Sequence, residues 1–357
     1  MRHVARVTVL AAALAAALGG SLAGCSTVGY LAQSVNGHLG LINAARPVKD
    51  WLAESTTPQA LRERLVLSQQ IRDFSIRELR LPDNSSYRSY ADLHRDAAVW
   101  NVVAAPELSL KLKTSCFPVV GCVGYRGYYG RKAADREAQT LRAEGNEAWV
   151  YGVPAYSTLG WTNWLGGDPL LNTFIRYPEG ELARMIFHEL AHQVAYAKGD
   201  TTFNESFATA VETIGITRWL DTRAGPAARE EYARFDARRH DFRALTQRYR
   251  ALLQSLYDSD LPDAEKRERK AALMQQLKRD HATMKAQRWG GYSGYDAWFE
   301  QANNASFGVL AAYAELVPDF ERLFAHCGGD FDRFYAEVRR LATLSRDERH
   351  AILRGPQ

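Results

Sequence analysis

Apolar residues recur at intervals of three and four in the first part of the chain, in the stretches "YLAQSVNGHLGLINAA" and "PQALRERLVLSQQIRDFSIREL". Such spacing places the apolar side chains on one face of a helix. Residues 27–80 are therefore predicted to be helical. The stretch "LPDNSSY", residues 81–87, breaks the pattern and ends this helical region.

Between residues 97 and 130 the pattern changes to closely spaced valine, tyrosine, tryptophan and glycine, a composition that favours strands. Strands are predicted at "AVWNVVAA", around the pair Cys116 and Cys122, and at "EAWVYGVPA". The stretch "KAADREAQTLRAEG" has helical spacing and is closed by Gly145. These segments predict a small sheet with helices attached to it.

The stretch "ELARMIFHELAHQVAYA" carries apolar residues every four positions, at Leu182, Ile186, Leu190 and Val194. This is the stripe of a helix that packs on one side. We expect Gly199 to end the helix and Asn204 to cap a second helix, "ESFATAVETIGITRWL". Because so few residues connect them, the two helices are predicted to run antiparallel.

Residues 226–288 are rich in alanine, leucine and charged side chains, with a break at "DSDLPD". Two long helices, 226–256 and 263–287, fit this pattern. Acidic residues are interleaved with the basic ones throughout, which argues against a membrane or nucleic-acid surface. We interpret the segment as a solvated helical hairpin inserted into the domain. The overall pattern predicts a helix-rich α+β fold.

The N-terminus has the features of an export signal: Arg2 and Arg6, a short alanine-rich apolar run, and small residues before Cys25. Residues 1–24 are predicted to be this signal. The sequence "LAGC" resembles the lipobox of bacterial lipoproteins, which implies that Cys25 becomes the lipid-modified N-terminus and anchors the chain to a membrane. Ser26 in the next position favours the outer membrane, facing the periplasm. The alternative is ordinary cleavage, with Cys25 as a spare thiol.

The remaining chain, 25–357, is long enough for one large domain. Its 45 basic and 41 acidic residues, less the two arginines of the signal, are nearly balanced, so nothing indicates a nucleic-acid partner. In an oxidising periplasm Cys116 and Cys122, separated by a proline and a glycine, are predicted to form a disulfide. The alternative is a pair of zinc ligands, but no second pair of suitable spacing accompanies them. Cys327 is expected to be buried without a partner.

The histidines of "HELAH" carry the strongest chemical signal in the chain. His188 and His192 are four residues apart, so both imidazoles project from one face of the helix. Two nitrogens so placed can bind one zinc ion at about 2.0 to 2.1 Å. Glu189 lies beside this face and is placed to take a proton from the attacking water, the division of labour of the His-Glu-x-x-His motif.

A third metal ligand is expected from the second helix. If the helices are antiparallel, Glu205 in its first turn lies near the level of His192. Two histidines and one glutamate leave a fourth position open, as in catalytic zinc sites. Glu212, one heptad later on the same face, is the alternative ligand; otherwise it is a residue that orients a ligand histidine from behind.

"HELAHQ" followed by "NESFATAVE" resembles the zinc signature of gluzincin metallopeptidases, especially aminopeptidase N-like enzymes. By that resemblance His188, His192 and Glu205 are the zinc ligands and Glu189 is the general base. Two features differ from those enzymes. The spacing from the second histidine to the glutamate is shorter, and the Gly-Ala-Met-Glu-Asn motif that binds the substrate amino terminus has no counterpart.

A second resemblance covers most of the chain after the signal. "GCSTVGY", "CFPVVGCVGYRGYY", "STLGW", "DPLLNTF", "HELAHQ", "NESFA" and "VPDFERL", in this order, resemble a family of proteobacterial lipoproteins classed as predicted zinc aminopeptidases. The resemblance implies a single zincin-like metallopeptidase domain that binds one zinc ion and hydrolyses peptides. The alternative is a non-catalytic envelope lipoprotein with a structural or vestigial zinc site that docks a partner.

Substrate-binding groups are less well defined by the sequence. Residues 149–160 are a candidate edge strand for aligning a peptide backbone, or an ordinary core strand. A tyrosine or histidine is expected to help hold the oxyanion. The candidates are Tyr156, Tyr292, Tyr295, Tyr313 and His240. An aminopeptidase also needs an acid for the free amine; Glu181 and Asp200 lie nearby in sequence, and the sequence assigns neither.

Overall fold

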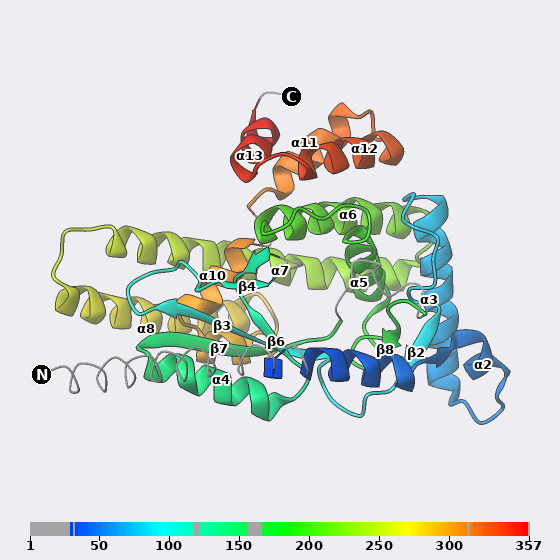
Figure 1. Cartoon of the computed structure of the whole chain (residues 1–357), viewed down its shortest axis with the longest axis horizontal. Coiled ribbons are helices and arrows are strands. Elements are labelled where there is room, and N and C mark those ends of the chain that lie inside the picture. The colour runs from blue at the N-terminus through cyan, green and yellow to red at the C-terminus, as the bar shows by residue number, and fades with distance from the viewer. Residues whose placement is uncertain (1–28, 31–32, 118–120, 156–165, 313–314, 356–357) are drawn as a thin grey trace, which may run out of the picture.

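The computed structural model describes residues 29–30, 33–117, 121–155, 166–312 and 315–355. Two three-stranded sheets and a two-stranded hairpin are surrounded by helices, as Figure 1 shows. No helix in these ranges is long and apolar enough to cross a lipid bilayer. The predicted helix-rich α+β class is confirmed.

The N-terminal part of the described chain forms one end of the molecule. Residues 33–44 are helical, and two further helices follow, α2 (Val48–Ala53) and α3 (Gln59–Arg77). The first sheet has the order β1-β2-β8, with β1 (Arg46–Pro47) antiparallel to β2 (Ser89–Ala91) and β2 parallel to β8 (Leu170–Leu171). The helical prediction for this region is confirmed, apart from the short β1 and the break after α2.

The second sheet has the order β6-β3-β7 and is antiparallel throughout. Its strands are β3 (Val99–Pro106), β6 (Arg126–Tyr128) and β7 (Asn146–Val153). Helix α4 (Arg131–Ala143) and helix α10 (Asn304–Ala312) both pack on this sheet. The strands and the helix closed by Gly145, which has a φ of 83°, match the sequence prediction.

The alternation of side chains along β3 explains why the sheet has two covered faces. Val102 and Ala104 pack in the apolar cluster that contains the alanines of α4. Val103 and Ala105 point the other way and pack with Ala305 of α10. Successive residues of a strand face opposite sides of the sheet, so a continuous apolar run such as "VVAA" requires cover on both.

Cys116 and Cys122 lie directly opposite each other in a hairpin formed by β4 (Ser115–Phe117) and β5 (Gly121–Val123), and a disulfide joins them. Cys327 is buried and reduced. At Gly121, whose φ is 79°, a Cβ would lie 2.9 Å from the backbone nitrogen of Gly199. The hairpin therefore rests against the loop that joins the two helices of the His-Glu-x-x-His region.

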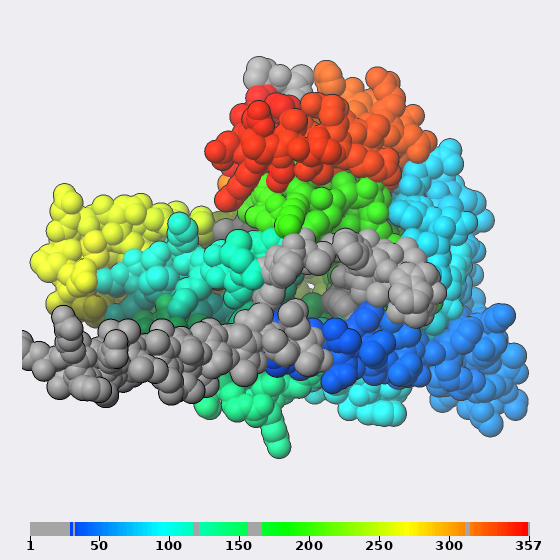
Figure 2. Space-filling view, in the orientation of Figure 1, coloured from blue at the N-terminus to red at the C-terminus, as the bar shows by residue number. Residues whose placement is uncertain are grey.

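Those two helices are α5 (Glu179–Ala191) and α6 (Thr201–Thr222), and they pack together through the largest apolar core. The C-terminal helices α11 (Val317–His326), α12 (Phe331–Ala342) and α13 (Arg346–Arg354) lie beyond α6. Figures 1 and 2 show this orange-to-red layer covering the green α6. Phe207 of α6 packs against Phe320 and Phe334 of the layer.

The predicted hairpin is present as α7 (Pro226–Tyr257) and α8 (Asp263–Gln287), followed by α9 (Asp296–Gln301). The interpretation of a merely solvated hairpin needs correction, because its inner face builds a second apolar core. The buried members of that core are Leu110, Phe242, Tyr249, Leu253, Leu256, Tyr257, Leu277, Trp289, Phe299 and Phe307.

Two predicted helix ends are wrong. Helix α5 ends at Ala191 and not at Gly199; a turn at residues 192–194 follows it. Asn204 does not cap α6. Asp200 does, with its side chain accepting a hydrogen bond from the backbone N–H of Phe203. The carboxylate of Asp200, four residues before Asn204, thus accepts a hydrogen bond from the first turn of α6, where backbone N–H groups lack a partner within the helix.

Candidate metal centre

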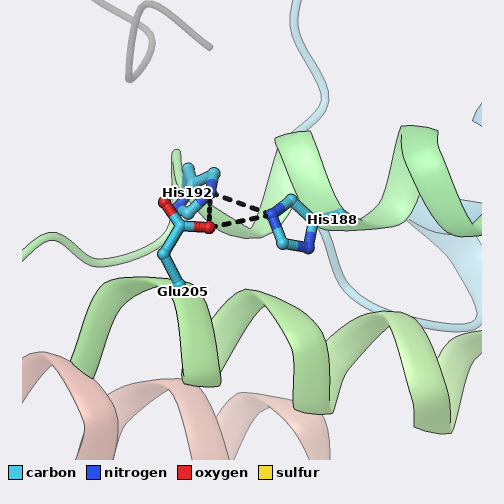
Figure 3. A group of neighbouring side chains, drawn as sticks. All are labelled: His188, His192 and Glu205. Atoms are coloured by element: carbon cyan, nitrogen blue, oxygen red, sulfur yellow. Dashed lines mark hydrogen bonds and ion pairs between the residues drawn. The ribbon is translucent and has the colours of Figure 1, made fainter. Parts of the chain in front are cut away.

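Two histidines and a glutamate converge between α5 and α6, as Figure 3 shows. The Nε2 atoms of His188 and His192 are 3.2 Å apart. Oε2 of Glu205 lies 3.3 Å from Nε2 of His188 and 3.7 Å from Nε2 of His192. The three ligand atoms therefore form a small triangle that faces a common point.

The dimensions of this triangle fit a metal ion. Four ligands at zinc distances in a tetrahedron are separated from one another by about 3.3 Å. The three measured separations of 3.2, 3.3 and 3.7 Å are close to that edge. Two imidazole nitrogens and one carboxylate oxygen are a donor set that zinc accepts. The residues present therefore fit a divalent cation, to which the described part of the chain offers three ligands.

The packing of α5 on α6 brings the three side chains together. Leu182, Ile186 and Leu190 of α5 are fully buried, which turns the histidine face toward α6. Arg184 contacts Glu212, while His192, two turns later at the C-terminal end of α5, contacts Glu205, two turns earlier in α6. Contacts that advance along one helix as they recede along the other are those of an antiparallel pair, as the short connection predicts.

The loop between the helices is tied down from inside. The side chain of Asn204 donates to the carbonyl of Ala197 at 2.9 Å and accepts from its N–H at 2.8 Å. Asn204, although not a cap, thus closes the loop just before Glu205. After His192, Gln193 donates to Asp168 and Ser86.

Glu212 binds the rear of His188 and takes no part in the triangle. Its Oε2 lies 3.1 Å from Nδ1 of His188, and its other oxygen pairs with Arg184. Burial opposes the charged carboxylate, but Arg184 and His188 outweigh it and lower the pKa of Glu212 to about 2. Of the two positions that the sequence left open, Glu205 is the one that the structure places beside both ring nitrogens.

The electrostatics of the triangle favour a positive charge between its members. Burial disfavours a charged His188, yet Glu205 and Glu212 raise its pKa well above the ordinary value. Burial also opposes ionisation of Glu205, but His192 and His188 hold its pKa well below the usual range. His188 and Glu205 thus stabilise each other in their charged forms. A bound cation would supply the positive charge that the proton on His188 supplies here.

Glu189 is 8% exposed and follows His188 on α5. Burial raises its pKa, against the opposing effect of His188 and His192. A carboxylate with a raised pKa holds a proton more readily than a solvated one, which suits a general base beside the candidate metal centre.

The structure also locates most of the other expected groups. Tyr295 stacks on Phe242, and Tyr292 packs edge-on against Phe235, both at the second core. His240 is exposed on α7. Cys25, Tyr156, Tyr313 and residues 156–160 of the expected edge strand lie outside the described residues. The order β6-β3-β7 places β7 at an edge of its sheet.

Three tyrosines near the triangle were missed from the sequence. Burial first, and then the charge of Glu205, raise the pKa of Tyr196. Burial also raises the pKa of Tyr151 to about 12, against the hydrogen bond from Asn101 and with a contribution from Glu205. Tyr125 is 36% exposed as a residue, but burial of its phenol group and the charge of Glu205 raise its pKa. All three phenols therefore stay protonated as hydrogen-bond donors. Nothing in their local spacing signals this position, because Tyr151 comes from β7, Tyr125 from the connection between β5 and β6, and Tyr196 from the loop after α5.

The two acids near the motif are already paired. Glu181 binds Arg184 and Arg239. Asp200 caps α6 and also binds Arg349 and His350 of α13. Neither carboxylate is available as the sole partner of a substrate amine.

These features define a helix-rich α+β protein in which two antiparallel helices hold a candidate metal centre. The chain belongs to the family described as "putative aminopeptidase", whose model matches residues 29–353. The match spans both cores and the whole of the site, and it indicates a peptidase. No curated protein and no solved structure matches the chain significantly.

Proposed function

We propose that the protein is a zinc-dependent aminopeptidase of zincin-like, gluzincin type. The observation that carries the proposal is the triangle of His188, His192 and Glu205, whose edges fit a tetrahedral zinc site. The buried Glu189 beside it is the second support. Membership of an aminopeptidase family supplies the reaction class.

Zinc held by these three side chains would polarise the scissile carbonyl and lower the pKa of water toward neutrality. Glu189 takes the proton of the water as its oxygen attacks the carbonyl carbon. When the C–N bond breaks, Glu189 passes that proton to the departing amine. Glu212 holds the ring of His188 through Nδ1, so that Nε2 faces the triangle.

The edge strand β7 is a candidate for aligning the peptide backbone by strand addition. Tyr151 of β7 remains protonated and lies within the field of Glu205. A phenol there can donate a hydrogen bond to the substrate carbonyl oxygen.

The test is hydrolysis by the zinc-loaded, full-length protein. Replacing Glu189→Gln keeps the shape of the side chain and removes the base, so zinc content should stay at the parent level while kcat falls by about 10² to 10⁴. Glu230→Gln, on the exposed face of α7, is the matched control. Parent-level turnover by the Glu189→Gln protein would refute the role of Glu189.

Comparing free and N-acetylated peptides tests the aminopeptidase assignment. An exopeptidase that binds the free amine loses the acetylated substrate, whereas an endopeptidase cleaves both. A protein that binds zinc but cleaves neither would favour the alternative of a non-catalytic envelope lipoprotein. The buried Glu189 argues against this alternative, because a structural site has no use for a base.

We further propose that Cys25 carries the lipid that anchors the protein to the outer membrane, facing the periplasm. The support is the sequence "LAGCS" after an apolar signal. Replacement of Cys25→Ser should abolish incorporation of labelled fatty acid and release the protein into the soluble fraction of the envelope. Retention of the label would overturn the assignment.

A further inference from the structure

A line of paired charges runs from the candidate metal centre to the long helix α7. Behind His188, Glu212 binds Nδ1 with one oxygen and Arg184 with the other. Nη1 of Arg184 lies 3.1 Å from Oε2 of Glu181, and the other oxygen of Glu181 binds Arg239. We call Glu212, Arg184, Glu181 and Arg239 the ion-pair ladder.

The ladder is shielded from water along its length. The side chains of Glu212, Arg184, Glu181 and Arg239 are 8%, 14%, 18% and 13% exposed. Only its far end is solvated, where Arg239 pairs with the half-exposed Asp236. Charges in so dry a setting are costly to separate, so a displacement of one member moves its neighbours.

Helix α7 is seated closely enough on α5 to hold the ladder in place. At Gly180 a Cβ would lie 2.5 Å from the ring of Tyr232 of α7. The same ring lies under the guanidinium of Arg239, whose central carbon is 5.8 Å from the ring centre. The absence of a side chain at Gly180 therefore allows the contact that brings Arg239 to Glu181.

The two histidines of the triangle differ in whether Nδ1, the ring nitrogen that lies outside the triangle, has a hydrogen-bond partner. Nδ1 of His188 is bound to Glu212. Nδ1 of His192 is buried and has no hydrogen-bond partner among the described residues. Glu212 thus fixes the orientation of the His188 ring. The other three members of the ladder fix the position of the Glu212 carboxylate.

We propose that Arg184, Glu181 and Arg239 are positioning residues that couple the placement of α7 to the zinc affinity of the site through Glu212 and His188. The inference rests on the proposed zinc site. It makes the inserted hairpin a part of the metal centre's support, although none of its residues belongs to the triangle.

The test measures zinc affinity of the full-length apoprotein by competition with a chromogenic chelator. Loss of a partner behind a ligand histidine lowers metal affinity about 10- to 100-fold, and this is expected for Glu212→Gln. Arg239→Met, three ion pairs further away, should lower it roughly 10-fold, the low end of that range. Arg234→Met is the control: it lies on the same helix in an exposed pair with Glu230 and should leave zinc affinity at the parent value.

A second variant and a double mutant separate positioning from a general loss of structure. Arg239→Lys keeps the positive charge and should restore most of the affinity lost in Arg239→Met. In the Glu212→Gln protein the carboxylate that connects Arg184 to His188 is already lost. Adding Arg239→Met to that protein should therefore weaken zinc binding little further. Cobalt-substituted protein should show a changed visible spectrum in Arg239→Met and the parent spectrum in Arg234→Met.

Zinc affinity at the parent value in Arg239→Met would overturn the proposal. So would a double mutant whose fold-loss of zinc affinity equals the product of the fold-losses of the two single variants. These outcomes are distinguishable from failure of the proposed function. A parent protein that binds zinc and cleaves no peptide refutes the peptidase, while the affinities still support or refute the ladder. A parent that binds no zinc refutes both.

Discussion

One oxygen of Glu205 faces both imidazole nitrogens of the candidate metal centre, at 3.3 and 3.7 Å. Glu212 lies on the same helix, and its carboxylate also touches His188, but at the opposite ring nitrogen. The side of the ring that a carboxylate reaches decides its chemical role. An acid at Nε2 can share a metal ion, whereas an acid at Nδ1 can only orient the ring.

The two glutamates should therefore respond differently to substitution. Glu205→Ala removes a direct ligand and should lower zinc affinity by more than about 100-fold, beyond the loss typical of a supporting partner. Glu212→Ala should retain one zinc per chain with the smaller loss. Elemental analysis after dialysis against a weak chelator measures both. Equal zinc content in the two variants would mean that Glu205 is not the third ligand.

At the residue scale, spacing in the sequence predicts the three members of the triangle and offers Glu212 as a residue behind a histidine, but it does not predict the rest of the ladder. His188 and His192 are fixed by one helical turn, and Glu205 follows from the short connection. Arg239 lies 58 residues from its partner Glu181, on a helix whose seat on α5 depends on tertiary packing. No local pattern encodes such a pair, so the ladder could not be predicted.

At the scale of elements, the close approach of α6 to α5 and to the turn after α3 depends on a missing side chain. A Cβ at Gly215 would lie 2.7 Å from Leu79 and 2.9 Å from the ring of Phe187 on α5. Gly215 is one turn beyond Glu212 on the buried side of α6. A residue with a Cβ would therefore force Leu79, the ring of Phe187 or the helices themselves to shift, close to the candidate metal centre.

Gly215→Ala should destabilise the protein although alanine favours helices. Alanine gains about 0.5 to 1 kcal/mol over glycine within a helix, but forcing a methyl group into a packed core costs about 1 to 3 kcal/mol. We expect a net loss of about 1 kcal/mol in the free energy of unfolding, measured by urea titration. Gly40→Ala is the control, because Gly40 is helical with no atom within 4 Å of its added Cβ. The Gly40→Ala protein should be slightly more stable than the parent. If the Gly215→Ala protein were as stable as the Gly40→Ala protein, the packing argument would be wrong.

The ends of elements were harder to predict than their existence. The bounds of α7 and α8 agree with the sequence pattern to within one residue. Near α6, however, both Asp200 and Asn204 are good capping residues. The choice between them depends on Ala197, whose N–H and carbonyl both hydrogen-bond to the Asn204 side chain. Helix-capping propensities carry no information about this contact.

At the scale of the whole molecule, the C-terminal layer and the start of α6 are held by one buried cluster. The carboxylate of Asp200 is 1% exposed and binds Arg349 at 2.9 Å and His350 at 2.9 Å. Its other oxygen caps α6. Helix α13 is thereby tied to the turn that precedes Glu205, so we expect loss of these contacts to loosen the start of α6 beside the candidate metal centre.

The decisive comparison uses two arginines of α13. Arg349→Ala leaves the carboxylate of Asp200 with His350, the cap and the more distant Arg346, whose Nε is 3.9 Å away. Breaking a buried pair costs about 3 to 5 kcal/mol. We expect about 3 kcal/mol, since His350 keeps part of the interaction. Arg354 pairs with Glu315 at the surface, with both side chains about half exposed, and Arg354→Ala should cost at most about 1 kcal/mol. Urea unfolding of the intact chain measures both losses.

Because Asp200 caps the helix that carries Glu205, the loop at residues 195–200 should show faster amide hydrogen exchange in the Arg349→Ala protein. Arg354→Ala should leave the exchange rate of this loop unchanged. Equal losses in the two variants would show that the C-terminal layer stabilises the molecule through its apolar contacts alone.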